Sequence, residues 1–215
     1  MQKRVDGEAI YLTLRQEIQQ GELGVEDYLK EVSVAERFGV SRTPAREALT
    51  RLVHERFLER TPRGLQLRQT SPQEIIQVYD VRITLEAEAA AQAAQNRNVT
   101  DLVKLEGLLQ RDLALTGPDD DTRTRTNLEF HEAIWAATHN PVLIDLLDRL
   151  SVHLIHKPSS TLSIGERWAE ALGEHAQILE AIQQRDATSA RTIAETHMRT
   201  ARELRLELFK QQVSA

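Results

Sequence analysis

The stretch GVSRTPAREALTRL, residues 39–52, carries the strongest structural signal in this sequence. Gly39-Val40 predicts a tight turn. Ser41 or Thr43 can then cap a helix that has Pro44 in its first turn. Four apolar residues follow at i, i+3, i+4 and i+7 spacing, as on the core-facing side of a helix: Ala45, Ala48, Leu49 and Leu52.

Two arginines at the start of this helix lie outside its apolar stripe. Arg42 precedes the stripe, and Arg46, one turn later, projects to one side of it. A helix that only filled a core would not need guanidinium groups in these places. An arginine can pair bidentately with the O6 and N7 atoms of guanine in the major groove of DNA.

The flanking segments predict the rest of a small domain. Helical patterns cover residues 7–20 and 31–38. Residues 57–60 and 65–68 alternate around a turn, which predicts a β-hairpin with Gly64 free to take a positive φ. Two short helices joined by a glycine turn and followed by a hairpin make a winged helix-turn-helix. In that motif the second helix enters the major groove of DNA.

Charge is divided unevenly along the chain. The formal net charge is −6, yet residues 37–68 hold eight arginines against three glutamates, a local balance of +5. A local basic face is what a phosphate backbone attracts. A solvated helix face laced with ion pairs is the alternative interpretation of the same charges.

The composition sets limits on the class of protein. Hydrophobic residues make up 40% and charged residues 28% of the chain, which is typical of globular proteins. The absence of cysteine excludes disulfides, thiolate zinc sites and thiol catalysis. The first ten residues hold no apolar signal core, and no apolar run reaches the ~18 residues of a membrane span. We therefore expect a cytoplasmic protein.

The second half of the chain carries helical signals throughout. Ser71-Pro72-Gln73-Glu74 is a capping box with proline at the first helical position, so a new helix is predicted to begin there. We expect one domain over residues 1–70 and a second over residues 71–215. The predicted fold is mainly α, a winged helix-turn-helix followed by an all-α bundle. Six helices are expected in the bundle, at about 72–95, 99–115, 119–138, 141–157, 164–184 and 187–210.

Three of the seven histidines lie beside apolar stripes on three different predicted helices: His131, His175 and His197. Asn127 lies one turn before His131, so both side chains project from one helix face. Three imidazoles and an oxygen ligand suit Zn²⁺, Ni²⁺ or a similar divalent ion. Spacing alone leaves open the alternative that each histidine is an ordinary surface or core residue.

A metal-dependent hydrolase is the alternative function for such a histidine cluster. His131-Glu132 begins like the zincin motif His-Glu-x-x-His, but residue 135 is tryptophan. No glycine-rich phosphate loop, nucleophile elbow or paired carboxylate arrangement stands out in the sequence. An enzyme would also leave the two arginines of the reading helix unexplained, so we expect no catalytic activity.

Residues 11–68 resemble the DNA-binding domain of the GntR family of bacterial transcription regulators. The resemblance rests mainly on residues 39–44, 46–49 and 62–64, which read GVSRTP, REAL and PRG. It implies that the DNA-reading residues are Ser41, Arg42, Thr43 and Arg46, with Gly64 at the tip of the wing.

The sequence departs from the GntR pattern at three places. Val25-Glu26 stands where the family usually has Pro-Gly, and Arg56 where it has glycine. Val32 occupies a place that is arginine in some relatives, so one base contact is expected to be absent. The first two departures concern turns rather than the reading helix.

Residues 75–200 resemble the FCD domain (FadR C-terminal domain), and six helices indicate its shorter subgroup. The matching pieces are Val81-Arg82, Leu85-Glu86, Phe130-His131, Asn140-Pro141, Glu174-His175 and His197. Many members bind a divalent metal through an aspartate and three histidines. Carried across, the ligands are Asn127, His131, His175 and His197. Asn127 replaces the aspartate, which leaves the site one unit more positive.

The FCD resemblance also implies a ligand and a mode of action. It places Arg82 in the cavity, where a guanidinium can contact a carboxylate bidentately. An ion pair with Asp80, Glu86 or a facing helix is the alternative role for Arg82. A divalent ion on neutral ligands beside an arginine favours a small organic acid as effector. The implied protein is a ligand-responsive regulator, a repressor rather than an activator. We expect a homodimer on an inverted-repeat DNA operator, because one winged domain touches few bases.

Overall fold

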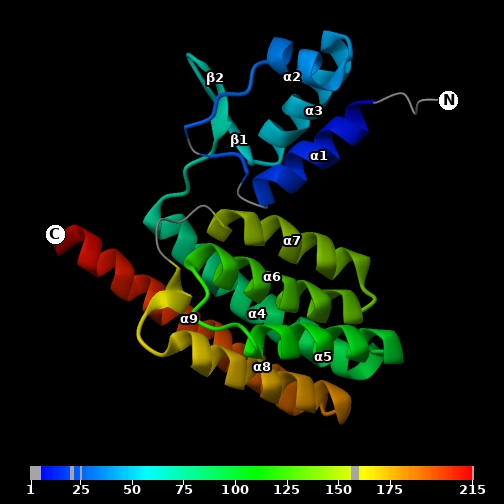
Figure 1. Cartoon of the computed structure of the whole chain (residues 1–215), viewed down its shortest axis with the longest axis vertical. Coiled ribbons are helices and arrows are strands. Elements are labelled where there is room, and N and C mark those ends of the chain that lie inside the picture. Colours follow the sequence, from blue (N-terminus) through cyan, green and yellow to red (C-terminus); the bar gives the residue numbers. More distant parts are fainter. Residues whose placement is uncertain (1–5, 20–21, 25, 156–159, 215) are drawn as a thin grey trace. The chain divides into compact units, whose positions relative to one another are not determined.

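The computed structural model describes residues 6–19, 22–24, 26–155 and 160–214. It divides into two compact units, Met1–Thr70 and Ser71–Ala215 (Figure 1). Among these residues the only sheet is one two-stranded hairpin in the first unit, and the second unit is helical. The predicted fold class is confirmed.

The N-terminal unit consists of three helices followed by the hairpin. Its elements are α1 (Gly7–Gln19), α2 (Glu31–Phe38), α3 (Arg42–His54), β1 (Leu58–Thr61) and β2 (Gly64–Leu67). The four apolar residues of the α3 stripe are buried, together with apolar residues of α1 and of the hairpin. The core is therefore formed by the side of α3 that lies away from its arginines, as the spacing predicted.

Helices α2 and α3 end in the same backbone motif. Gly39 follows α2 with φ 64°, and Arg56 follows the α3 cap with φ 63°. In each case the next residue donates its N–H to the carbonyl five residues earlier, at 3.0 Å for Val40 and 2.9 Å for Phe57. This left-handed ending is favourable for glycine and strained for a residue with a Cβ atom. The departure at Arg56 thus lies where the backbone geometry favours glycine.

The hairpin is tied to the segment that leads into α2. β1 and β2 pair in antiparallel register, with Thr61 opposite Gly64. Leu29 exchanges two backbone hydrogen bonds with Leu65, at 2.7 and 2.9 Å. Gly64 has φ 143°, and a Cβ atom on it would lie 3.0 Å from the carbonyl oxygen of Leu29. The close approach of the two backbones therefore explains why glycine occupies this position, independently of any contact with DNA.

The C-terminal unit is built around two long helices, α4 (Pro72–Asn96) and α9 (Ala187–Ser214), which pack along each other (Figure 1). α4 begins at the predicted capping box, in which the Ser71 hydroxyl accepts the Glu74 N–H at 3.2 Å. Around this pair lie α5 (Val99–Leu113), α6 (Asp120–Ala137), α7 (Pro141–Ile155), a 3₁₀ turn η1 (Thr161–Ser163) and α8 (Arg167–Gln183). α8 begins later than the predicted residue 164, because residues 164–166 form a turn in which Gly165 has φ 53°.

Alanines of α4 allow the neighbouring helices to approach closely. Ala89, Ala90, Ala93 and Ala94 are all fully buried. Large side chains from α6, α7 and α8 pack in the same core: Phe130, Ile134, Trp135, Leu147, Ile178 and Ile182. Helices α6, α8 and α9 also carry the histidines into the interior, and α4 and α8 carry their charged partners.

We predict that Arg56→Gly stabilises the N-terminal unit by about 0.5–1 kcal/mol, because relief of the left-handed strain exceeds the added freedom of the unfolded chain. Urea unfolding followed by circular dichroism measures this stability. Tryptophan fluorescence would report on the other unit, because both tryptophans lie there. Arg60→Gly in β1 is the control. It removes the same charge at a strand position and should lower stability. Equal destabilisation by both substitutions would contradict the prediction.

Candidate functional site

His131, His175 and His197 come together in the interior of the C-terminal unit, from α6, α8 and α9. One ring nitrogen of each lies within 4.8 Å of the other two. The ring centroids are 5.1–5.3 Å apart in all three pairs, so the rings form a nearly equilateral triangle. His175 is the deepest member and stacks on Phe130 at 4.3 Å.

Asn127 and His175 present buried polar atoms that have no partner. The side-chain oxygen of Asn127 and both ring nitrogens of His175 make no hydrogen bond with any residue that the structure describes. Buried polar groups in proteins are nearly always satisfied. A carbonyl oxygen and an imidazole nitrogen are also atoms that divalent metals accept as ligands. The unsatisfied atoms therefore fit a cation at this place.

Glu86 orients His131 through a contact with its Nδ1 atom. One carboxylate oxygen lies 3.2 Å from His131 Nδ1 and accepts the indole N–H of Trp135 at 2.7 Å. The other oxygen accepts a hydrogen bond from Arg82, four residues earlier on α4. A carboxylate beside Nδ1 favours the tautomer that carries its proton there, which leaves the Nε2 lone pair for a ligand bond.

Glu174 serves His197 in the same way. Its Oε2 atom lies 2.5 Å from His197 Nδ1, and Arg167 donates to both carboxylate oxygens, at 2.8 and 2.6 Å. Two of the three histidines are thus each held by a glutamate, which is in turn held by an arginine.

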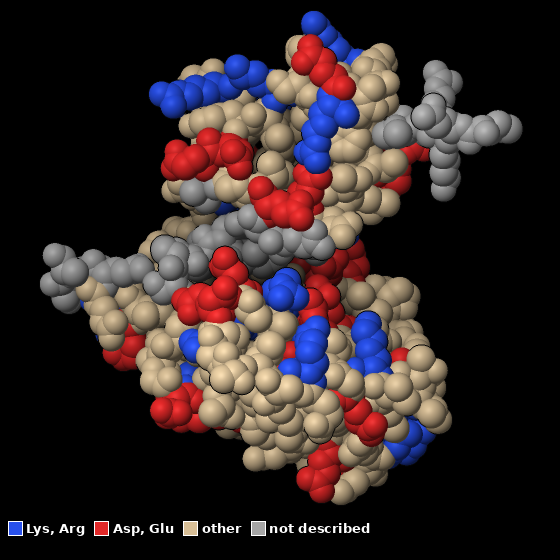
Figure 2. All heavy atoms as spheres, in the orientation of Figure 1, with Lys and Arg blue, Asp and Glu red and all other residues tan. Residues whose placement is uncertain are grey.

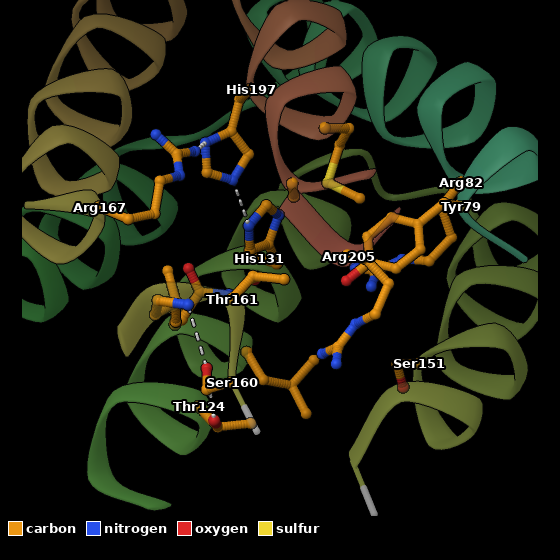
Figure 3. Close-up of a pocket in the computed structure, with 15 residues that line it drawn as sticks. Tyr79, Arg82, Thr124, His131, Ser151, Ser160, Thr161, Arg167, His197 and Arg205 are labelled. Atoms are coloured by element: carbon orange, nitrogen blue, oxygen red, sulfur yellow. Dashed lines mark hydrogen bonds between the residues drawn. The ribbon is translucent and has the colours of Figure 1, made fainter. Parts of the chain in front are cut away.

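The Nε2 atoms of His131 and His197 face each other at 3.2 Å, and the two rings point toward one another in Figure 3. Two bare nitrogen lone pairs repel at this distance unless a cation lies between them. Nitrogens that share one metal ion at ~2.0–2.1 Å are separated by roughly 3.0–3.4 Å. The observed spacing therefore fits a shared divalent ion.

The electrostatics disfavour a charged His175 and keep the supporting glutamates charged. Burial, followed by the neighbouring His197 and His131, holds the pKa of His175 well below its usual value. Although burial opposes it, the hydrogen bonds from His197 and Arg167 lower the pKa of Glu174 to about 2. The charges of His131 and Arg82 likewise hold the pKa of Glu86 below its usual range against the effect of burial. Neutral imidazoles are the form that binds metal.

A cavity of about 100 Å³ lies beside these histidines (Figure 3). Arginines and hydroxyl groups make up much of its polar lining: Arg82, Arg167, Arg205, Tyr79, Thr124, Ser160 and Thr161. Asn127, His131 and His197 reach its wall, whereas His175 lies behind it. The cavity is therefore suited to an oxygen-rich anion.

Arg82 combines the two roles that its sequence position left open. It lines the cavity and also forms the ion pair with Glu86, whereas Asp80 pairs with Arg202. Its Nε atom is buried and makes no hydrogen bond within the described part of the chain. With Glu86 beside it, Arg82 does not add the full uncompensated charge that the sequence suggested.

The four predicted DNA readers of the N-terminal unit are exposed at the start of α3: Ser41, Arg42, Thr43 and Arg46. Ser41 occupies the cap position, but its hydroxyl makes no capping hydrogen bond, so it stays available to a ligand. The open N–H groups of this helix end also attract phosphate. Gly64, the fifth predicted residue, lies at the start of β2 beside Leu29.

Ion pairs account for part of the basic charge in this unit. Arg37 pairs with Glu17, Arg46 with Glu31, and Arg51 with both Glu8 and Glu55. Acidic and basic side chains accordingly alternate on the face shown in Figure 2. Arg42, in contrast, forms no ion pair with the residues placed by the structure. The ion-pair interpretation thus holds for Arg37, Arg46 and Arg51, and the phosphate-binding interpretation stays a prediction.

Glu174, Arg167 and Trp135 were not singled out from the sequence as site residues, and Glu86 was named only as a possible ion-pair partner of Arg82. Glu86 and Glu174 lie within the dipeptides that carry the FCD resemblance, which was the available signal for them. Trp135 occupies the place where a zincin would have its second histidine, and it donates to Glu86 instead. Nothing in the local pattern around Arg167 pointed to the site.

Comparisons with known proteins agree with both halves of this description. Residues 77–200 match the FCD domain, and residues 7–64 match the bacterial regulatory proteins of the gntR family. The chain belongs to the GntR family. The members of this family are DNA-binding transcription regulators and not enzymes, so the hydrolase alternative has no support.

Similar proteins match along most of their length. The chain is 30% identical over 203 residues to the Uxu operon transcriptional regulator of Escherichia coli, covering 82% of this chain and 77% of that protein. It is 27% identical over 177 residues to the gluconate operon transcriptional repressor of Bacillus licheniformis, covering 81% and 71%. The solved structure of E. coli McbR/YncC shares the fold, with a TM-score of 0.78, 24% identity and coverage of 94% and 98%.

None of the helices that the structure describes is both long and apolar enough to cross a bilayer.

We predict that Glu86→Gln and Glu174→Gln each weaken divalent metal binding by roughly 10–100-fold. A glutamine can turn its NH₂ group toward Nδ1, which moves the histidine proton to Nε2 and blocks the ligand atom. Competition with a chelator of known affinity measures the effect. Glu88→Gln is the matched control, because Glu88 lies on α4 but pairs with Arg191 away from the histidines. Metal affinities equal to that of the control would show that the glutamates do not orient the ligands.

Proposed function

We propose that this GntR regulator is a homodimeric repressor that leaves its operator when a small organic acid binds beside a divalent metal ion. The ligands are Asn127, His131, His175 and His197. The observation that carries the proposal is the set of unsatisfied acceptor atoms on Asn127 and His175, beside an arginine-lined cavity.

The metal ion would be held mainly by nitrogen. Three imidazoles with one oxygen ligand favour Zn²⁺ or Ni²⁺ over the oxygen-seeking Mg²⁺ and Ca²⁺. When bound, the ion supplies positive charge and coordination positions for a carboxylate. His131 and His197 offer Nε2, because Glu86 and Glu174 hold their Nδ1 protons.

Asn127 makes an anionic ligand more valuable at this site. Its amide oxygen carries no net charge, so the four protein ligands leave both charges of a divalent ion uncompensated. A carboxylate that enters the cavity supplies the missing negative charge. Arg82 lies on the cavity wall with a buried Nε–H that lacks a partner, so it can donate to the same acid.

A similar protein supports the sign of regulation and suggests which acids to test first. The relative from Bacillus licheniformis is described as a repressor of the gluconate operon. Gluconate is a small hydroxy acid, and the hydroxyl groups of Thr124, Ser160 and Thr161 line the present cavity. Gluconate and related hydroxy acids are therefore the first ligands to test.

Binding regulates DNA affinity only if the acid prefers one arrangement of the dimer. Helix α4 carries Arg82 and Glu86 and is the first element after Thr70, where the DNA-binding unit ends. A displacement of α4 is thus the shortest covalent route from the cavity to the reading helices. Two copies related by two-fold symmetry recognise an inverted repeat.

We predict that Arg42→Ala or Arg46→Ala costs about 1–3 kcal/mol of binding free energy on the operator and much less on random DNA. The reason is the loss of a bidentate contact to guanine. Gel-shift titration with a duplex selected by the wild-type protein from a random pool measures both affinities. Arg199→Ala, an exposed arginine of α9, is the control. Equal losses on both duplexes would mean that the arginine contacts phosphate only, and no loss would refute the reading helix.

We predict that gluconate or a related hydroxy acid binds with metal present and releases the operator. Chelation, His175→Ala and Arg82→Ala should each reduce acid affinity by at least about tenfold. The first two remove or weaken the binding of the positively charged metal ion, and the third removes a charged hydrogen-bond donor. Asn127→Asp should instead tighten metal binding and weaken acid binding, since its carboxylate replaces the charge of the acid. Calorimetry with and without chelator measures these changes. If acid binding and operator release survive chelation and both alanine substitutions, the acid binds elsewhere in the protein.

A further inference from the structure

One ion pair joins the starts of the two helices of the helix-turn-helix. Arg46 on α3 donates its Nε–H to Glu31 on α2 at 3.0 Å. The Arg46 side chain remains 63% exposed, and the Glu31 side chain 39% exposed. The terminal nitrogens Nη1 and Nη2 of Arg46 have no hydrogen-bond partner within the described ranges. Arg42, one turn earlier on α3, forms no such pair.

The carboxylate of Glu31 is unfavourable for general DNA affinity. It lies next to a predicted DNA-reading residue, where a negative charge repels the phosphate backbone. Stability does not explain it well, because an exposed ion pair adds little to the folding free energy. Glu31 is, however, the first residue of α2, where the helix dipole favours an anion.

The geometry of the contact leaves the reading end of Arg46 free. A guanidinium group has five N–H donors in a rigid planar fork, and the Nε–H lies on a side edge that is distinct from the end formed by the two terminal nitrogens. With Nε–H held by Glu31, both terminal nitrogens can still donate to O6 and N7 of one guanine. A side chain held in one rotamer also loses less conformational entropy on binding.

The backbone that presents Glu31 is itself held in place. Leu29, two residues earlier, exchanges two hydrogen bonds with Leu65 of β2. Gly64 allows this close approach, because any side chain there would meet the Leu29 carbonyl. The wing thus supports the residue that holds the reading arginine.

We propose that Glu31 is a positioning residue that fixes Arg46 for base recognition and so determines specificity at one base pair. This inference rests on the reading role of Arg46. Glu31 would thus improve discrimination between DNA sequences and would lower the affinity for DNA in general.

The test compares Glu31→Gln with Glu36→Gln on a selected duplex and on random DNA. Glu36 is an exposed glutamate on the same helix with no ion pair to the described residues, so both variants lose one negative charge. For Glu31→Gln we expect operator affinity to fall roughly three- to tenfold, because the Arg46 side chain would then lose more conformational entropy when it binds. Its affinity for random DNA should stay equal or rise. Glu36→Gln should raise both affinities or change neither.

A double-mutant cycle and a base scan separate positioning from other roles. In an Arg46→Ala background, Glu31→Gln should cause no further loss on the operator. The base pair whose preference is relaxed by Glu31→Gln should be the one relaxed by Arg46→Ala. Glu31→Asp should recover part of the loss. Unchanged thermal melting of Glu31→Gln excludes a loss caused by unfolding.

Each other outcome overturns the inference. A rise of operator and random-DNA affinity together would show that Glu31 is only a repulsive charge. A full operator loss that persists in the Arg46→Ala background would show that Glu31 contacts DNA itself. If Arg46→Ala alone leaves the operator affinity unchanged, the reading role of Arg46 has failed, and Glu31 has nothing to position.

Discussion

The arrangement of the C-terminal unit depends on two imidazole Nε2 atoms that face each other at 3.2 Å in a buried place. Each imidazole is fixed in this orientation by a glutamate on its Nδ1 side. A buried carboxylate needs compensating charge and donors, and Arg82 and Arg167 supply them. Both arginines then reach the cavity wall. The polar interior is thus one connected set of groups, from the histidines outward to the ligand cavity.

This connection means that the predicted metal ligands and the cavity depend on the same buried residues. Arg82, Glu86 and His131 form one chain of contacts, and Arg167, Glu174 and His197 form another. A ligand that binds Arg82 or Arg167 therefore also affects the glutamate that the arginine contacts, and each of these glutamates orients a histidine. Substitutions in one part of the interior should therefore be interpreted together with their effect on the other, since such networks are not additive.

The sequence was most informative where the signal was local. The capping box at Ser71 and the stripe of α3 each depend on residues within a few turns, and the structure confirms them. The partners of the histidines could not be found in this way, because Glu86 lies 45 positions from His131 and Glu174 lies 23 from His197. Periodicity identifies a buried face but not which polar groups meet across it.

Arginine shows why residue type alone does not reveal a role in this protein. Arg42 is exposed and without an acidic partner among the described residues, Arg46 is exposed and held by one glutamate, and Arg82 is buried and held by another. An exposed guanidinium keeps its donors for an external anion, whereas a buried one must first satisfy a carboxylate of its own chain. The same side chain is therefore suited to phosphate and base contacts in one unit and to cavity electrostatics in the other. Burial and the position of the nearest glutamate decide between these roles.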